Sequence, residues 1–328
     1  MYDYAFLAGG LVLLIVGGEM LVRGAATTAA RLGMSPLLIG LTLVGFGTST
    51  PELVTSVEAS LIGSPGIAIG NIVGSNIANV LLILGVATLI MPLMVDRRAL
   101  ARDGTIVVFT AAAFVVVGYL FPFGRLVGTV FVVGLVAYLY YAYRQERSGA
   151  PEGHTAAFEK REAHDEVIQP RDIASEQTAG HIWTPILLAV AGLIVVILGG
   201  KLLVDGAVGI ARTAGISETL IGLTIVSIGT SLPELVTSVI AALRRHGDVA
   251  LGNILGSNIY NILGIGGATA LIAPTTIPPD IVRFDSLVML AVSLALLVVA
   301  RTGYRISRAE GVVLLAGYGA YIYAIWPS

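Results

Sequence analysis

Long apolar segments follow one another along almost the whole chain of 328 residues, and this feature limits the possible folds most strongly. Each segment has roughly 20 residues or more, the length that a helix needs to cross the hydrocarbon core of a bilayer. Only 12% of the residues are charged, which is about half the fraction usual in soluble proteins. We therefore predict an all-α polytopic membrane protein. The formal net charge of −2 and the lack of a basic run give no support for a nucleic-acid partner.

These segments predict ten transmembrane helices, near residues 4–30, 35–62, 66–93, 103–121, 124–143, 183–213, 217–244, 248–273, 284–301 and 307–326. Between the fifth and sixth helices lies a polar segment that is rich in charged side chains and cannot bury a core of its own. We therefore predict a first five-helix unit at residues 1–143, a linker at 144–182 and a second five-helix unit at 183–328. A solvated connector is the favoured interpretation of the linker, ahead of a regulatory segment.

The distribution of arginine predicts the orientation of the chain, because cytoplasmic loops of membrane proteins carry an excess of Lys and Arg. With the N-terminus outside, the inner loops carry Arg31, Arg97, Arg98, Arg102, Arg144, Arg147, Arg244, Arg245, Arg301, Arg305 and Arg308. The outer loops then carry only Arg125, Arg212 and Arg283. We expect a multi-pass protein of the cell membrane with both termini extracellular and the linker cytoplasmic.

The two halves of the chain repeat each other at a constant offset. Residues 38–57 recur at 220–239, and residues 70–79 recur at 252–261. The offset is 182 positions both for Glu52 and Glu234 (234 − 52) and for Asn79 and Asn261 (261 − 79). Because each half holds an odd number of predicted helices, the second half enters the membrane from the opposite side. Inverted repeats of this kind place a transporter's site at the repeat interface near the midplane, although a channel can share the symmetry.

Glu52 and Glu234 lie well inside apolar segments, where a carboxylate costs at least a few kcal/mol and is functional by default. Each follows a proline, which lacks an N–H group and clashes with the carbonyl four residues earlier. Carbonyl oxygens near Thr48 and Thr230 are therefore expected to be free for coordination. Side chains four residues apart share a helix face, and this spacing joins Thr48 with Glu52, Ser75 with Asn79, and Ser257 with Asn261.

A cavity lined by carboxylate, amide, hydroxyl and carbonyl oxygens suits a hard cation such as Ca²⁺ or Na⁺. Zinc or copper would require Cys or His at membrane depth, and the chain has no cysteine at all. Two glutamates give a formal charge of −2, which one Ca²⁺ or several Na⁺ ions neutralise in alternation. Glu19, Lys201 and Asp205 are less regular between the halves and are interpreted as gating or interface residues. Glu58 corresponds to Ile240 and is expected to lie outside the symmetric site.

The paired motifs resemble the α-repeats of the sodium/calcium exchanger family within the cation/calcium antiporters. The resemblance rests on Gly47-Thr-Ser-Thr-Pro-Glu52, on Gly70-Asn, Gly74-Ser-Asn and Asn79, and on their second copies, and it covers essentially all of the membrane portion. It implies ten helices and exchange of Ca²⁺ against Na⁺, with the first and sixth helices sliding as a gate. Ca²⁺ and Na⁺ are then transported ions rather than tightly bound cofactors.

The resemblance also implies ligands. The glutamates that match Glu52 and Glu234 hold Ca²⁺, together with carbonyl groups that match Thr48 and Thr230. Implied sodium ligands are Ser49, Ser231, Ser75, Ser257, Asn79 and Asn261, with backbone ligands near Gly45 and Ser227. Some family members carry an aspartate in place of one of the two asparagines, so the amides argue against potassium dependence. The linker is too short for the calcium-sensing domains of larger relatives.

Sodium/calcium antiport is favoured, because hydroxyl and amide ligands serve sodium and a proton needs none. Proton/calcium antiport is the main alternative, since carboxylates also carry protons. A passive channel would lack coupling between the ions. An intramembrane enzyme would use the glutamates as acid and base, but it needs a nucleophile or a metal, and the sequence offers only paired Ser and Thr. The oligomeric state stays open, and one chain with its lipid bilayer suffices for the site.

Overall fold

The computed structural model describes residues 2–32, 47–95, 97–147, 155–167 and 183–326. The first half contains α1 (Tyr2–Arg31), α4 (Thr50–Leu61), α5 (Pro65–Ala78), η2 (Asn79–Ile83), α6 (Leu84–Ile90), β1 (Leu93–Met94), α7 (Arg97–Ala99), η3 (Leu100–Gly104), α8 (Thr105–Leu120) and α9 (Arg125–Arg147). The linker contains α10 (Ala156–Val167). The second half contains α12 (Trp183–Ala214), α13 (Glu218–Ile221), η4 (Gly222–Val226), α14 (Ser227–Thr230), α15 (Leu232–Leu243), α16 (Gly247–Ile259), η5 (Tyr260–Gly266), α17 (Gly267–Ile272), η6 (Ile281–Asp285), α18 (Ser286–Arg301), β2 (Arg305–Ile306) and α19 (Arg308–Ile325).

The helices follow the apolar segments closely, and consecutive α- and π-helical pieces join into long rods. The predicted range 66–93, for example, is helical from Pro65 to Ile90, and the range 248–273 from Gly247 to Ile272. Within the described ranges, seven helices are long and apolar enough to cross a membrane, or eight if one bent pair counts as a single span. The predicted range 35–62 is described only from residue 47. Ten transmembrane helices therefore stay a prediction.

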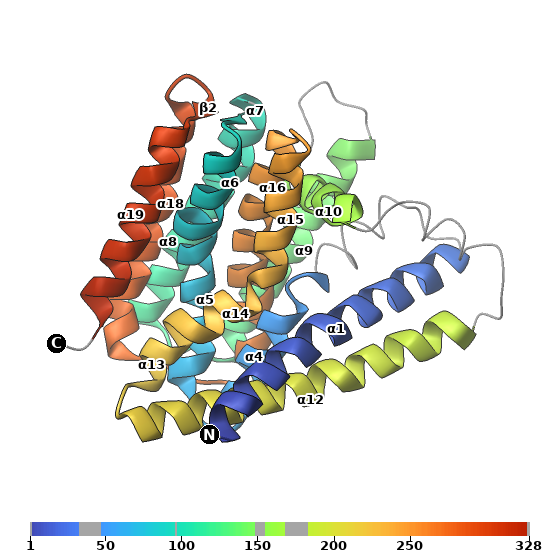
Figure 1. Cartoon of the computed structure of the whole chain (residues 1–328), viewed down its shortest axis with the longest axis vertical. Coiled ribbons are helices and arrows are strands. Elements are labelled where there is room, and N and C mark those ends of the chain that lie inside the picture. The colour runs from blue at the N-terminus through green and yellow to red at the C-terminus, as the bar shows by residue number, and fades with distance from the viewer. Residues whose placement is uncertain (1, 33–46, 96, 148–154, 168–182, 327–328) are drawn as a thin grey trace.

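Helices α1 and α12 form a long antiparallel pair along one side of the molecule (Figure 1). Glycines seven residues apart line their contact, so that the two backbones approach closely. A Cβ atom at Gly10 would overlap the backbone nitrogen of Leu203, and one at Gly24 would overlap that of Ala189. The seam consists of Gly10, Gly17 and Gly24 on α1 and of Gly192, Gly199 and Gly206 on α12.

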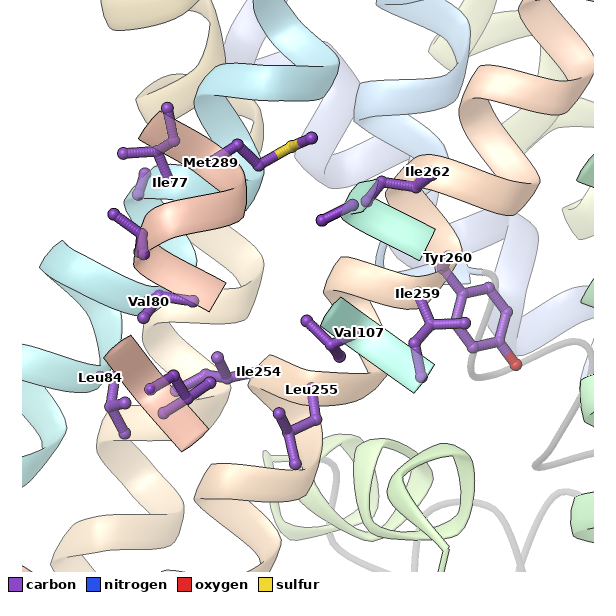
Figure 2. Close-up of a cluster of buried hydrophobic side chains, with 14 of the residues drawn as sticks. Ile77, Val80, Leu84, Val107, Ile254, Leu255, Ile259, Tyr260, Ile262 and Met289 are labelled. Atoms are coloured by element: carbon purple, nitrogen blue, oxygen red, sulfur yellow. The ribbon is translucent and has the colours of Figure 1, made fainter. Parts of the chain in front are cut away.

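The other long helices form a bundle whose apolar core joins the two halves of the chain. Figure 2 shows Ile77 and Leu84 of the first half in the same cluster as Ile254, Ile259 and Met289 of the second half. Short strands β1 and β2 pair in an antiparallel manner beside the loop that precedes α19. The core therefore fixes the first half against the second around the polar residues described below.

Two breaks in the helices place those polar residues. The chain leaves the helical conformation at Thr48 and Ser49 before α4, and at Ser231 between α14 and α15. The axes on either side of Ser231 bend by 47°. Pro51 and Pro233 lie in the first turn of the following helices, where a missing N–H group costs no helical hydrogen bond. The glutamates thus lie at the start of new helices.

The linker is not a simple solvated connector. Residues 156–167 form α10, which packs against α15 and α16 (Figure 1). Its residues Ala156, Ala157 and Lys160 have no exposed surface. The prediction of a solvated segment is therefore wrong for this part of the linker, because tertiary contacts bury a helix whose composition is polar.

Candidate cation site

Glu52 and Glu234 lie in the first turns of α4 and α15, and each is only 1% exposed. Each carboxylate is bound by a serine from the other half. Ser231 Oγ donates to Glu52 Oε1 at 3.0 Å, and Ser49 Oγ donates to Glu234 Oε1 at 3.2 Å. Both serines occupy the helix breaks, so the sequence repeat becomes a reciprocal pair of hydrogen bonds between the halves.

Two asparagines hold the backbone of the glutamates. Asn71 Nδ2 donates to the carbonyl oxygen of Glu52 at 3.1 Å, and Asn253 Nδ2 donates to that of Glu234 at 3.3 Å. Thr230 Oγ1 in turn donates to Asn71 Oδ1 at 2.9 Å. Both asparagines are fully buried. They were not among the predicted ligands, although the repeated Gly-Asn dipeptide contains them.

A chain of hydroxyl groups continues from Glu52 into the second half. Ser231 Oγ lies 3.0 Å from Ser75 Oγ, which is 3.5 Å from the carbonyl oxygen of Ser227. Ser227 and Ser75 are both fully buried. Predicted sodium ligands from two helices of opposite halves thereby come together beside one glutamate.

Asn79 and Asn261 lie at the starts of the π-helices η2 and η5, which widen the helix at corresponding places in the two halves. Asn79 Nδ2 donates to Asn258 Oδ1 at 2.9 Å. The side chain of Asn261 is buried, and neither its amide nitrogen nor its oxygen has a hydrogen-bond partner within the described ranges. Hydrogen bonds therefore link Asn79 to a second asparagine rather than to a glutamate.

Several buried oxygen atoms at these positions have no hydrogen-bond partner among the residues that the structure describes. Buried polar atoms are nearly always satisfied, so such atoms are candidates for a ligand. They are Thr48 Oγ1, Glu52 Oε2, Glu234 Oε2, Asn79 Oδ1 and Asn261 Oδ1. Carboxylate, amide and hydroxyl oxygens form the ligand set that Ca²⁺ and Na⁺ prefer. In the described part of the chain, no cluster of three or more His, Cys, Asp or Glu is present.

A cavity of about 350 Å³ adjoins the two helix breaks. Its wall is formed by α1, by the residues around the two prolines and by His164 of α10; the lining includes Gly18, Glu19, Val22, Thr48, Pro51, Pro233 and Thr237. Glu19 forms a partly exposed salt bridge of 3.4 Å with Arg23. Thr48 thus belongs both to the group of residues with unsatisfied oxygen atoms and to the lining of the cavity beside α1.

Gly45, which was predicted to offer a backbone ligand, lies outside the described residues. The other predicted positions are all buried.

The prediction missed Lys160, whose ammonium lies 3.3 Å from Glu234 Oε1 and 2.5 Å from Ser257 Oγ. It also missed Asp103 and Asp285, two buried acids at the repeat offset of 182 (285 − 103). The offset is the signal that would have found these acids.

Long apolar helices around buried glutamates, hydroxyls and amides define a membrane protein of the transporter class. A family model described as sodium/calcium exchanger protein matches residues 2–144 and 184–326. The chain belongs to the sodium/calcium exchanger family, a family of cation/calcium antiporters, and it is a transporter rather than an enzyme.

Individual relatives agree with this assignment along nearly their whole length. The chain is 38% identical to a putative antiporter, CaxA, of Alkalimonas amylolytica over 98% of both proteins. It is 36% identical to the sodium/calcium exchanger MaX1 of Methanosarcina acetivorans over 99% of this chain and 98% of that protein. A solved structure of the sodium-calcium exchanger NCX_Mj has a TM-score of 0.63 and 31% identity, with 99% of each chain covered.

Proposed function

We propose that this protein exchanges Ca²⁺ for Na⁺ across the cell membrane at a site formed by Glu52 and Glu234. The observation that carries the proposal is the pair of unsatisfied carboxylate oxygens, one on each buried glutamate. The names of MaX1 and NCX_Mj as sodium/calcium exchangers support the same ion pair.

In each glutamate, one carboxylate oxygen accepts a hydrogen bond within the protein, and the other is available to bind an ion. In each, Oε1 accepts a serine hydroxyl from the other half, which fixes the carboxylate, while Oε2 has no partner in the described structure. One Ca²⁺ neutralises the formal charge of −2. Na⁺ ions achieve the same neutrality with help from the neutral oxygens of Ser75, Asn79 and Asn261. Exchange then follows, because both ions compete for the same two carboxylates.

Alternating access completes the proposal. We take the chain to comprise ten transmembrane helices in two inverted five-helix repeats, with α1 and α12 moving together across the site. The glycine seam supports this movement as a pair, because the two backbones are in direct contact at seven-residue intervals. The cavity between α1 and Thr48 lies where an access path to the site is required.

The test is uptake of ⁴⁵Ca²⁺ into proteoliposomes that contain the purified protein. An outward Na⁺ gradient is expected to drive uptake, and potassium on either side is expected to make no difference, since both Asn79 and Asn261 are neutral. Uptake driven by a pH gradient in the absence of sodium would instead establish proton/calcium antiport. Flux that follows the Ca²⁺ gradient alone, without coupling, would establish a channel.

A further inference from the structure

The buried face of α10 centres on a lysine. Lys160 has no exposed surface, although lysine is almost never fully buried unless it is paired. Its ammonium lies between Glu234 Oε1, at 3.3 Å, and Ser257 Oγ, at 2.5 Å. The same ammonium is 5.8 Å from the ring centroid of Tyr260, within the range of a cation–π interaction. A positive charge from the linker therefore occupies the carboxylate and hydroxyl ligands of the candidate cation site.

The surface of α16 is shaped to receive α10. A Cβ atom at Gly256 would lie 3.0 Å from the carbonyl oxygen of Ala156 and 3.2 Å from Lys160 Cβ, and one at Gly252 would overlap the side chain of Glu159. The corresponding glycines of the first half, on α5, contact η4 instead. The first-half counterpart of η4, residues 40–44, lies outside the described residues. Among the described residues, the glycine surface of α16 is thus matched to the linker helix.

The first turn of α10 is held by a buried acid. Asp103 Oδ2 accepts the backbone N–H of Ala156 at 2.9 Å, so a carboxylate lies at the positive end of the helix dipole. Asp103 also forms a salt bridge of 2.9 Å with Arg102. Farther along α10, burial together with the positive charges of Lys160 and Arg23 lowers the pKa of His164 to about 4, so this imidazole is neutral at physiological pH. Lys160 is then the residue through which α10 brings charge to the site.

We propose that α10 is a tethered inhibitor of transport, in which the ammonium of Lys160 replaces a transported cation beside Glu234 and Ser257. The ammonium neutralises the charge of Glu234 and engages Ser257 Oγ, a predicted sodium ligand, so a transported cation gains both only when α10 leaves. Because the lysine belongs to the same chain, it competes at an effective concentration that is set by the linker rather than by the solution. This inference rests on the cation site proposed above.

The experiment measures ⁴⁵Ca²⁺ uptake by Na⁺-loaded proteoliposomes as a function of external Ca²⁺ for the full chain and three variants. Lys160→Met removes the charge but keeps an apolar side chain of similar length. Lys160→Arg keeps the charge, and Arg161→Met is the matched control that removes a neighbouring positive charge of α10. If α10 is seated in about nine of ten molecules, Lys160→Met lowers the half-saturating Ca²⁺ concentration about tenfold. Lys160→Arg and Arg161→Met are expected to stay within twofold of the unmodified protein.

The outcomes separate this inference from the proposed function. One outcome would overturn the inhibitor alone. In it, the unmodified protein takes up Ca²⁺, and the half-saturating Ca²⁺ concentration of Lys160→Met is unchanged or higher. Absence of Ca²⁺ transport from every variant would overturn the cation site and the inhibitor with it. A Lys160→Met protein that fails to elute as a monodisperse species in detergent would also refute the inhibitor, because a helix that must leave during transport cannot be required for the fold.

Discussion

Replacing either buried glutamate by glutamine tests whether the two free carboxylate oxygens hold the ion. In Glu52→Gln, the amide oxygen retains the hydrogen bond from Ser231, and the NH₂ group then takes the place of the unsatisfied Oε2. A cation ligand is thereby replaced by a donor, and the site keeps a formal charge of −1. Glu234→Gln makes the same change beside Ser49, and it also removes the charge that pairs with Lys160.

The expected loss is larger for Ca²⁺ than for Na⁺. At a metal–oxygen distance of about 2.4 Å and an effective dielectric constant of about 20, one carboxylate attracts Ca²⁺ by roughly 14 kcal/mol and Na⁺ by roughly 7 kcal/mol. Dehydration of the ion and of the carboxylate offsets most of this attraction. If about a quarter remains, Ca²⁺ affinity falls several hundredfold and Na⁺ affinity roughly twentyfold.

The assay is Na⁺-driven ⁴⁵Ca²⁺ uptake at matched amounts of reconstituted protein, with the elution profile in detergent as a check on folding. Because each acid offers the ion one unsatisfied carboxylate oxygen, Glu52→Gln and Glu234→Gln are expected to lose uptake to a similar extent. Glu58→Gln is the matched control, since Glu58 is only half-buried, lies on the same helix as Glu52 and has Ile240 as its counterpart. Uptake near the unmodified level in Glu52→Gln or Glu234→Gln would show that these acids are structural, and the proposed site would be wrong.

Three further predictions concern the halves, the seam and the orientation. Ser49→Ala and Ser231→Ala each remove the hydroxyl that donates a hydrogen bond to one carboxylate. Both are expected to raise the half-saturating Na⁺ concentration by about threefold to tenfold. An effect confined to one of them would contradict the reciprocal geometry. Gly17→Leu is expected to separate α1 from α12 and to abolish transport or lower the thermal midpoint in detergent. Gly9→Leu is the control and should be tolerated, because among the described residues no other segment has an atom within 4 Å of the position of a Cβ there. A single cysteine at His154 is expected to resist an impermeant thiol reagent in intact cells, and rapid labelling there would place the linker outside.

Much of the fold was accessible from the sequence because membrane helices must satisfy their own backbone hydrogen bonds over a fixed length. Runs of apolar residues therefore indicated helix positions such as 100–120 and 281–301 to within a few residues. The repeat at a constant offset likewise identified Glu52 and Glu234 as candidate ligands without knowledge of any contact.

What could not be predicted depends on contacts between distant segments. The hydrogen bond of Ser49 to Glu234, and of Ser231 to Glu52, needs both halves in place, and the spacing within either half does not reveal it. Lys160 belongs to a segment whose composition indicates solvent, and its burial follows from a carboxylate more than seventy positions away. Composition describes the average environment of a segment and cannot identify the one side chain that departs from it.

The exchange of serine hydroxyls between the halves has a consequence for how such a chain evolves. A substitution at Ser49 alters the environment of Glu234 rather than that of its own neighbour Glu52, so the two copies of the duplicated unit cannot drift apart independently at these positions. Separately expressed halves should for the same reason be inactive alone and regain transport only when they assemble.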